Sequence, residues 1–204
     1  MASPIGHALA GIAVAWGADL VPGNRTWRTA PPSASWYRRA GNGLTLGCAV
    51  LAAAPDLDLF FGRFHRTATH SVTAVVVVAV IAALAAARAG HPVARFAWMC
   101  AGAWATHLVL DWLSADQSIP RGFQLLWPFD GTWFISGWDV FVGSERRRLL
   151  SAATMRQNGV AIAQELVLLL PIVVGLWLIR AKTLAGLSTE LARHEQARKV
   201  KRVP

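Results

Sequence analysis

Apolar residues fall into five long stretches separated by polar segments. The stretches run over about Ile5 to Val21, Gly43 to Phe61, Ser71 to Ala87, Val93 to Leu113 and Gly159 to Ile179. A helix needs roughly 20 mostly apolar residues to span a bilayer, with about 17 as the lower limit. Asp19 lies near the end of the first stretch, so we expect that helix to be short or tilted. The pattern predicts an all-α integral membrane bundle of about four to five helices.

The polar segments suggest one membrane domain and a tail. A long connection runs from Ser114 to Asn158, and the chain after residue 180 is rich in Lys and Arg. This last segment carries Leu184, Leu187 and Leu191 at near-helical spacing, which is typical of a basic amphipathic helix at a membrane surface. We therefore expect a membrane-embedded domain over residues 1–180 and a basic amphipathic tail over residues 181–204.

Composition supports the membrane class. Hydrophobic residues make up 54% of the 204 residues and charged residues 15%, and the mean hydropathy is +0.40. These values depart from ordinary soluble proteins. Met1 to Pro4 lacks the basic start of a signal peptide, so we expect the first stretch to stay in the mature protein. Cys48 and Cys100 lie inside apolar stretches, which predicts buried free thiols.

The formal charge of +9 indicates an anionic partner. The basic residues are spread over loops and the tail, without an aromatic-interleaved recognition motif, so we expect no direct nucleic-acid binding. Membrane lipids with anionic headgroups are the expected partner. The ten tryptophans are interpreted as interfacial anchors.

Titratable residues gather at the ends of the apolar stretches, where a charge at membrane depth costs on the order of 3 kcal/mol. They are His7, Asp56, Asp58, His65, His70, His107 and Asp111. If the helices alternate in direction, all seven fall on the same face of the membrane. Scattered structural polar residues would not be expected to do this, so the pattern indicates a metal site.

The residue types narrow the choice of metal. Imidazole nitrogen with carboxylate oxygen suits zinc or manganese, whereas all-oxygen sites suit calcium or magnesium. His107 and Asp111 are four residues apart, so a helix presents both on one face. Taken alone, this pair is equally well explained by a hydrogen bond at a helix end. Asp56 and Asp58 either both point to the metal, or one binds it while the other acts as a base.

Short motifs then follow one another in a recognisable order. They are Gly6-His7, Pro55-Asp56-Leu57-Asp58, His65-Arg66, Thr69-His70-Ser71, His107-Leu108-Val109-Leu110-Asp111 and Leu126-Trp127-Pro128. Over the first two thirds of the chain they resemble the YdjM family of membrane-bound, metal-dependent hydrolases, some of which are described as LexA-binding inner-membrane proteins. The resemblance implies a multi-pass protein of the bacterial inner (cytoplasmic) membrane.

A more distant resemblance concerns the order of the ligands. The series His, Asp, His and then His-x-x-x-Asp is similar to that of bacterial zinc-dependent phospholipase C. Carried over residue by residue, it implies that one metal is bound by Asp56, His70, His107 and Asp111, with His7 joining Asp111 on a neighbouring metal. Only His194 follows Asp111 among the histidines, so we expect one or two ions, zinc first and manganese second, rather than three.

The resemblance implies hydrolysis of a phosphoester of a lipid or lipid-linked substrate by a metal-activated water. In that reaction Asp58 would take the proton or orient the water. His65 would protonate the leaving group or support a ligand, and Arg66 would neutralise a phosphoryl oxygen. Asp58, His65 and Arg66 could equally be supports of the metal ligands.

Charge counts predict the orientation. Thirteen of the 20 Lys and Arg residues fall on the face opposite the candidate site and seven on its own face. The positive-inside rule then places the site outside the cytoplasm and the tail inside it. A non-catalytic adaptor or scaffold that recruits a cytoplasmic partner is the alternative function. A transporter is the third, but it would place the polar residues at mid-membrane depth.

The remaining titratable residues receive plainer interpretations. We expect Glu165 to be a hydrogen-bonded group between helices and Asp19 to be an interfacial cap. His91 and His194 are expected to be solvated. Any further metal ligands would have to come from Asp116, Asp130, Asp139 or Glu165.

Overall fold

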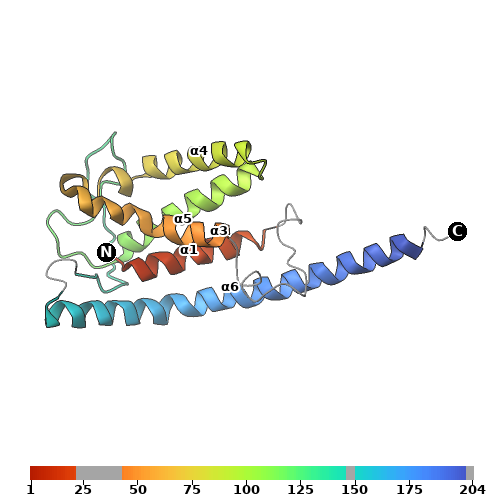
Figure 1. Ribbon diagram of the computed structural model, residues 1–204. Coiled ribbons are helices and arrows are strands. Elements are labelled where there is room, and N and C mark those ends of the chain that lie inside the picture. Colours follow the sequence, from red (N-terminus) through yellow and green to blue (C-terminus); the bar gives the residue numbers. More distant parts are fainter. Residues whose placement is uncertain (22–42, 146–149, 201–204) are drawn as a thin grey trace.

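Helices make up the architecture of the chain. The computed structural model describes residues 1–21, 43–145 and 150–200, and this part contains no strand beyond two isolated bridges. The α-helices are α1 (Pro4–Ala18), α3 (Gly43–Ala53), α4 (Val72–Arg88), α5 (Val93–Leu113) and α6 (Ala152–Val200) (Figure 1). Two 3-10 segments, η2 (Ala54–Phe64) and η3 (Ala68–His70), connect α3 to α4. The prediction of an all-helical bundle is confirmed.

Within the described residues, three segments are long and apolar enough to cross a membrane. They are Gly43–Phe60, Val93–Leu113 and Ala152–Thr183, and the shorter α1 and α4 are also apolar. Along the chain, α1, α4 and α6 start at one end of the bundle, and α3 with η2 and α5 finish there (Figure 1). This alternation brings five chain segments to the same end, where the described part of the long connection after α5 also lies (Figure 1).

Serine caps set the start of two helices at this end. Ser3 Oγ accepts a hydrogen bond from Gly6 N at 3.2 Å, and Pro4 occupies the first turn of α1. Ser71 Oγ accepts from Ala74 N at 3.2 Å at the start of α4. Serine satisfies the free N–H groups of a first turn, and proline needs no partner there. The caps therefore fix where α1 and α4 begin.

The second apolar stretch is not one straight helix. α3 ends at Ala53, and the chain continues as the 3-10 segment η2. Pro55 has no N–H to donate and its ring clashes with the preceding turn, which disfavours an uninterrupted α-helix. Asp56 and Asp58 lie in this segment and are both buried. The break therefore positions two carboxylates that a continuous helix would have placed differently.

The last helix is much longer than the predicted stretch. α6 is continuous from Ala152 to Val200 and extends past the other helices (Figure 1). It crosses residue 180, so the division into a domain over 1–180 and a tail over 181–204 stays a prediction. The side chains of Leu184, Leu187 and Leu191 lie outside the described residues, so the amphipathic tail is also untested.

Small residues allow α1, α3 and α5 to pack closely. One buried cluster consists of Ala15, Cys48, Ala52, Met99 and Ala103. A Cβ on Gly11 would lie 2.3 Å from the carbonyl oxygen of Cys48, so only glycine fits where α1 crosses α3. Such small-residue contacts are typical of helices that pack within a membrane. Cys48 and Cys100 are free and buried, as predicted.

A buried charge cluster joins three helices at the end of the bundle where α1 ends and α5 begins. Asp19, which caps α1, pairs with Arg95 of α5 through Nη2, and Arg180 Nε of α6 donates to Asp19 Oδ2 at 2.6 Å. Arg180 is only 4% exposed. Asp19 thus caps α1, as expected, and its ion pairs with Arg95 and Arg180 also hold α1 against α5 and α6.

Replacing Asp19 by asparagine is expected to lower the free energy of unfolding by about 2 kcal/mol, because both arginines lose a charge-assisted hydrogen bond. Thermal or denaturant unfolding of the detergent-purified protein measures this. Glu190→Gln removes one carboxylate from an exposed position of α6 and serves as the control. Equal stability of Asp19→Asn and wild type would contradict the prediction.

Candidate metal centre

The predicted ligands meet at the end of the bundle where α1 begins. α1 contributes His7, η2 contributes Asp56, η3 ends with His70, and α5 contributes His107 and Asp111. His7, His70 and His107 have no exposed surface, and the two aspartates are also buried. Residues separated by up to 104 positions in sequence are therefore gathered into one buried cluster.

Asp56, His70, His107 and Asp111 each offer one ligand atom, and these four atoms lie within 4.8 Å of one another. They are called the four-atom set below. His107 Nε2 is 3.1 Å from His70 Nε2, 3.3 Å from Asp111 Oδ2 and 3.7 Å from Asp56 Oδ1. His70 Nε2 is 3.7 Å from both carboxylates. Ligands 2.0–2.1 Å from a tetrahedral zinc ion are about 3.3 Å apart. The spacing of these four atoms therefore fits a tetrahedral cation.

The remaining ring nitrogens of two histidines orient them toward the cluster. His107 Nδ1 donates to the carbonyl oxygen of Ala52 at 2.8 Å, and His70 Nδ1 donates to Asp58 Oδ2 at 3.1 Å. A donor at Nδ1 leaves a lone pair on Nε2 in neutral imidazole. Metal-binding histidines usually show this arrangement, in which a carbonyl or carboxylate fixes the ring. In the neutral form, both histidines therefore have an Nε2 lone pair available for a cation.

His7 supplies an independent indication of a ligand. Its ring stacks on His107 with the centroids 3.8 Å apart. Neither ring nitrogen of His7, nor Oδ2 of Asp111, has a hydrogen-bond partner among the described residues, and all three atoms are buried. An unsatisfied buried polar group costs about 1–3 kcal/mol. Cations bound at His7 Nε2 and at Asp111 Oδ2 would satisfy two of these three atoms.

His7 lies beside a second pair of carboxylate oxygens in the same cluster. His7 Nε2 is 3.4 Å from Asp111 Oδ1 and 3.9 Å from Asp56 Oδ2. These are the carboxylate oxygens that do not belong to the four-atom set. His7 is therefore placed to share Asp111 and Asp56 with His70 and His107, as bridging carboxylates do in two-metal sites.

The electrostatics of the cluster favour positive charge. Burial lowers the pKa of His70, but the carboxylates of Asp56, Asp58 and Asp111 together raise it to about 9. Opposite charges a few ångströms away stabilise the charged form of a buried group. The cluster is thus an environment that attracts a proton or a metal cation.

Asp58 lies outside the four-atom set and accepts hydrogen bonds from several residues around it. Its Oδ1 accepts from His65 Nδ1 at 2.5 Å. Its Oδ2 accepts from Thr69 Oγ1 at 2.5 Å and from the backbone N–H of Arg66 at 3.1 Å, in addition to His70 Nδ1. Asp58 therefore holds His65 and His70 in fixed orientations. Asp58, His65 and His70 also form a second group with metal-ligand spacing.

Arg66 has partners that the sequence did not indicate. Its Nη1 donates to Asp116 Oδ2 at 2.8 Å and to Ser118 Oγ at 2.6 Å, and the guanidinium lies over the Trp133 ring at 5.3 Å from the centroid. Burial raises the pKa of Asp116, but hydrogen bonds from Ser118 and Gly122 and the charge of Arg66 hold it below its usual value. Arg66 is thus fixed by an ionised carboxylate.

The whole-chain comparison agrees with the motifs. The YdjM family model, described as YdjM inner membrane protein, matches residues 1–184. The chain belongs to this family. Together with the three long apolar helices, the match shows a membrane protein. No curated protein and no solved structure matches the chain.

A pocket of about 660 Å³ adjoins the cluster in this YdjM-family chain. Its polar lining includes His65, Arg66, Asp116, Ser118, Asp139 and Gln157. His65 lies next to the ligands, with its ring centroid 5.6 Å from that of His70, and the pocket lining includes His65 but not Asp56, His70, His107 or Asp111. Within the described chain, the non-glycine residues with left-handed backbone are Arg66 (φ 65°) and Asp139 (φ 49°), and both line the pocket. Such conformations concentrate at functional sites.

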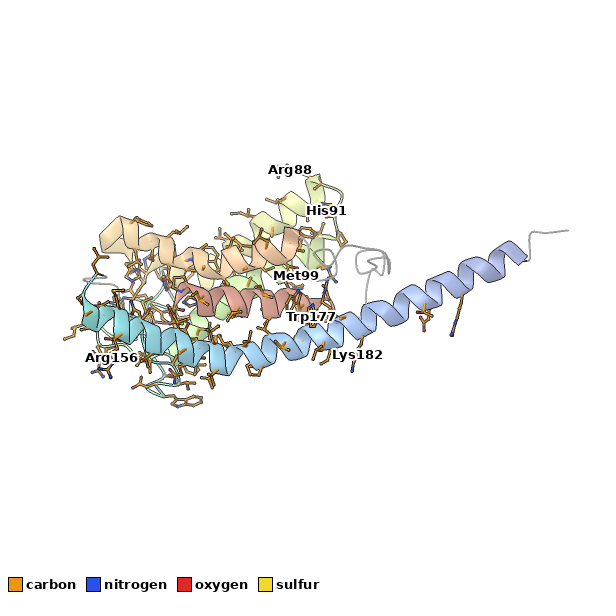
Figure 2. All side chains as sticks on the ribbon, turned by 60° about the horizontal axis from the view of Figure 1, so that its bottom comes forward. Arg88, His91, Met99, Arg156, Trp177 and Lys182 are labelled. Atoms are coloured by element: carbon orange, nitrogen blue, oxygen red, sulfur yellow. The ribbon has the colours of Figure 1, made fainter. Side chains whose placement is uncertain are left out.

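The other candidate ligands lie outside the cluster. Asp116 binds Arg66, Asp130 accepts from Thr132 in an exposed turn, and Asp139 lines the pocket. His91 is exposed at the opposite end of the bundle, where its ring stacks on Phe96 (Figure 2). His194 lies outside the described side chains.

Several supporting contacts could not be found from the sequence. The carbonyl of Ala52 that orients His107 carries no sequence signal. Thr69, which donates to Asp58, and Asp116, which fixes Arg66, are polar residues near motifs but have no distinctive spacing. Only the position of Thr69 inside the Thr69-His70-Ser71 motif could have indicated a role.

Asp58→Asn is expected to weaken zinc binding about 10-fold to 100-fold, because an amide cannot accept from both His65 and His70. Competition with a chromophoric chelator measures the dissociation constant. Asp116→Asn removes a carboxylate that touches Arg66 and no ligand, so it should keep the wild-type affinity. Unchanged affinity in Asp58→Asn would rule out its orienting role.

Proposed function

We propose that the protein is a membrane-bound, metal-dependent hydrolase that cleaves a phosphoester of a lipid or lipid-linked substrate. The observation that carries this proposal is the four-atom set with metal-ligand spacing, beside the unsatisfied buried atoms of His7 and Asp111. Folded proteins normally leave few buried polar atoms without a hydrogen-bond partner. A purely structural cluster gives no reason for them.

The donor set fits zinc, with manganese as the second choice. Asp56, His70, His107 and Asp111 would hold one ion, and His7 would join Asp111 and Asp56 on a second. When bound, the cation would supply an activated water, since zinc lowers the pKa of water from 15.7 to about 7. We propose one or two ions on this basis.

His65 and Asp58 would handle the proton of the leaving group. The Nδ1–H of His65 donates to Asp58, so its Nε2 is the nitrogen available to a substrate. The His65 side chain is 18% exposed and lines the pocket. As the bond from phosphorus to the leaving oxygen breaks, His65 would give its Nε2 proton to that oxygen. Asp58 would then orient His65 rather than act on the water itself.

Arg66 would stabilise the phosphoryl group. Its guanidinium is held by Asp116 and Ser118, so it needs no reorganisation when negative charge develops on a phosphoryl oxygen. Arginine also offers several donors in a fixed plane, which suits phosphate. This role explains why Arg66 lines the pocket beside His65.

The surroundings favour a lipid substrate. The pocket lining includes charged and polar side chains that suit a headgroup, and its volume lies in the size range of small-ligand sites, roughly 300–1,000 Å³. On η2, next to His65, Leu57, Leu59 and Phe60 are exposed large hydrophobic residues, and Leu59 also lines the pocket. A polar headgroup would enter the pocket while its chains remain beside η2 in the bilayer.

We also propose a multi-pass topology with the site on the extracytoplasmic face and the tail in the cytoplasm. Arg88 and Lys182 lie at the end of the bundle away from the cluster, whereas Arg156 lies at the cluster's end (Figure 2). The excess of positive charge away from the site supports this orientation by the positive-inside rule.

Phospholipid hydrolysis by the zinc-loaded protein tests the function. Mixed micelles of phosphatidylethanolamine and phosphatidylglycerol are incubated with the protein, and released diacylglycerol and water-soluble phosphoester are measured. We expect turnover that a chelator abolishes and zinc restores. Zinc-loaded protein that cleaves no member of a broad phosphoester panel would overturn the proposal. Protein that binds no metal at all would favour the adaptor or scaffold.

A further inference from the structure

Glu165 is a buried carboxylate that the proposed chemistry does not use. It lies within α6, inside the apolar segment Ala152–Thr183, and has no exposed surface. Removing a carboxylate from water is costly unless charge or hydrogen bonds compensate it. The partners of Glu165 therefore indicate what it does.

Those partners belong to Ser3, the N-cap residue of α1. The backbone N–H of Ser3 donates to Glu165 Oε1 at 2.6 Å, and Ser3 Oγ–H donates to Oε2. The N-terminus of a helix carries partial positive charge, which stabilises an anion at this position. Glu165 thus binds the start of α1 from the neighbouring helix α6.

Glycine at position 6 makes this contact possible. A Cβ on Gly6 would lie 2.5 Å from Glu165 Oε2 and 2.8 Å from its carboxyl carbon. Any side chain there would displace the carboxylate from Ser3. The glycine of the Gly6-His7 motif is therefore required by Glu165, which lies 159 positions later in the chain.

The segment that Glu165 binds also touches the metal cluster. The backbone N–H of Ala2, next to Ser3, donates to Asp111 Oδ1 at 2.9 Å. The backbone N–H of His7 donates to Ser3 O at 3.1 Å, so His7 lies one turn beyond the Glu165 contact. Ala2 to His7 is thus held between Glu165 of α6 and Asp111 of α5.

We propose that Glu165 is a positioning residue, which fixes the first turn of α1 so that His7 and Asp111 keep their places in the cluster. The identity of this cluster as a metal centre rests on the proposed function, whereas the positioning itself does not. Removing an outer partner of a metal ligand typically weakens metal binding 10-fold to 100-fold. We expect a change of this size for Glu165→Ala and a smaller one for Glu165→Gln, which keeps one acceptor for Ser3 N–H.

The other end of the same helix pair provides a matched control. Asp19 and Arg180 also join α1 to α6, but they lie at the end of the bundle away from the cluster. Asp19→Asn should therefore destabilise the packing of α1 on α6 without changing metal affinity. Gly6→Ala attacks the contact with Glu165 from the side of α1 and should reproduce the effect of Glu165→Ala.

The first measurement is the zinc dissociation constant of the full-length protein in detergent, with thermal unfolding of each metal-free variant alongside. We expect Glu165→Ala and Gly6→Ala to bind about 10-fold to 100-fold more weakly, while Asp19→Asn binds like wild type. Wild-type affinity in Glu165→Ala overturns the proposal. An equal loss in Asp19→Asn also overturns it, because the effect would then be general destabilisation.

The second measurement needs no metal. Diethyl pyrocarbonate modifies accessible histidines, and mass spectrometry of the His7 peptide reports its rate in metal-free protein. We expect His7 to be protected in wild type and Asp19→Asn, and to react at least several-fold faster in Glu165→Ala. Unchanged protection overturns the inference even if zinc binds. A wild type that binds no zinc but shows the faster His7 reaction in Glu165→Ala overturns the metal function and supports the positioning role.

Discussion

Replacing His107 by alanine is expected to remove stoichiometric metal from the purified protein. Its Nε2 lies 3.1–3.7 Å from ligand atoms of His70, Asp111 and Asp56, so it is central to the set. The hydrogen bond from Nδ1 to Ala52 O fixes the orientation of the ring. Plasma mass spectrometry of protein purified without chelators measures zinc and manganese. We expect wild type to carry one or two ions per chain and the variant only the background amount.

His91→Ala is the control for this experiment. His91 is exposed at the other end of the bundle, so its loss should leave the metal content unchanged (Figure 2). A full complement of metal in His107→Ala would contradict the four-atom set. Parallel unfolding curves show whether the variant remains folded, which separates lost coordination from lost structure.

Arg66→Ala is expected to lower kcat for phosphoester cleavage by about 10²–10³-fold while the metal content stays unchanged. The guanidinium is fixed by Asp116 and Ser118 and contacts no atom of the four-atom set, so its removal affects the chemistry and not the ligands. Arg66→Lys should restore little activity, because an ammonium cannot reproduce the planar arrangement of donors. Turnover of phospholipid in mixed micelles, measured beside metal content, tests both variants.

Arg156→Ala provides the matched control for a lost positive charge. Arg156 is exposed on α6 at the same end of the bundle and does not line the pocket (Figure 2). It should retain wild-type turnover. Full activity in Arg66→Ala would exclude its role at the phosphoryl group, and loss of metal in that variant would make Arg66 a structural support.

The helices themselves were largely predictable because each depends on local sequence. The apolar stretches predicted α4 and α5 within one residue at either end, and the serines before α1 and α4 cap them. Two differences have local causes that the apolar pattern does not include. Pro55 disfavours a longer α3, so the chain continues from Ala54 as the 3-10 segment η2. α6 extends beyond the apolar stretch at both ends through residues with good helix propensity.

The gathering of the candidate ligands at one end also followed from the sequence. Consecutive helices alternate in direction, so residues at the start of one helix and the end of the next share a face. This argument placed His7, Asp56, His70 and His107 together before any contact was known. It requires only the order of the helices and the position of each residue along its helix.

The sequence by itself determined the helices, the end of the bundle that carries the titratable residues, and the set of candidate ligands. Only the tertiary structure decided which atoms face one another: Asp58 on His70, Asp116 on Arg66, Ala52 O on His107 and Glu165 on Ser3. Each contact depends on how a helix is rotated about its axis. In a membrane both the buried and the lipid-facing sides of a helix are apolar, so hydropathy gives no measure of that rotation. Packing between helices that are distant in sequence sets it instead.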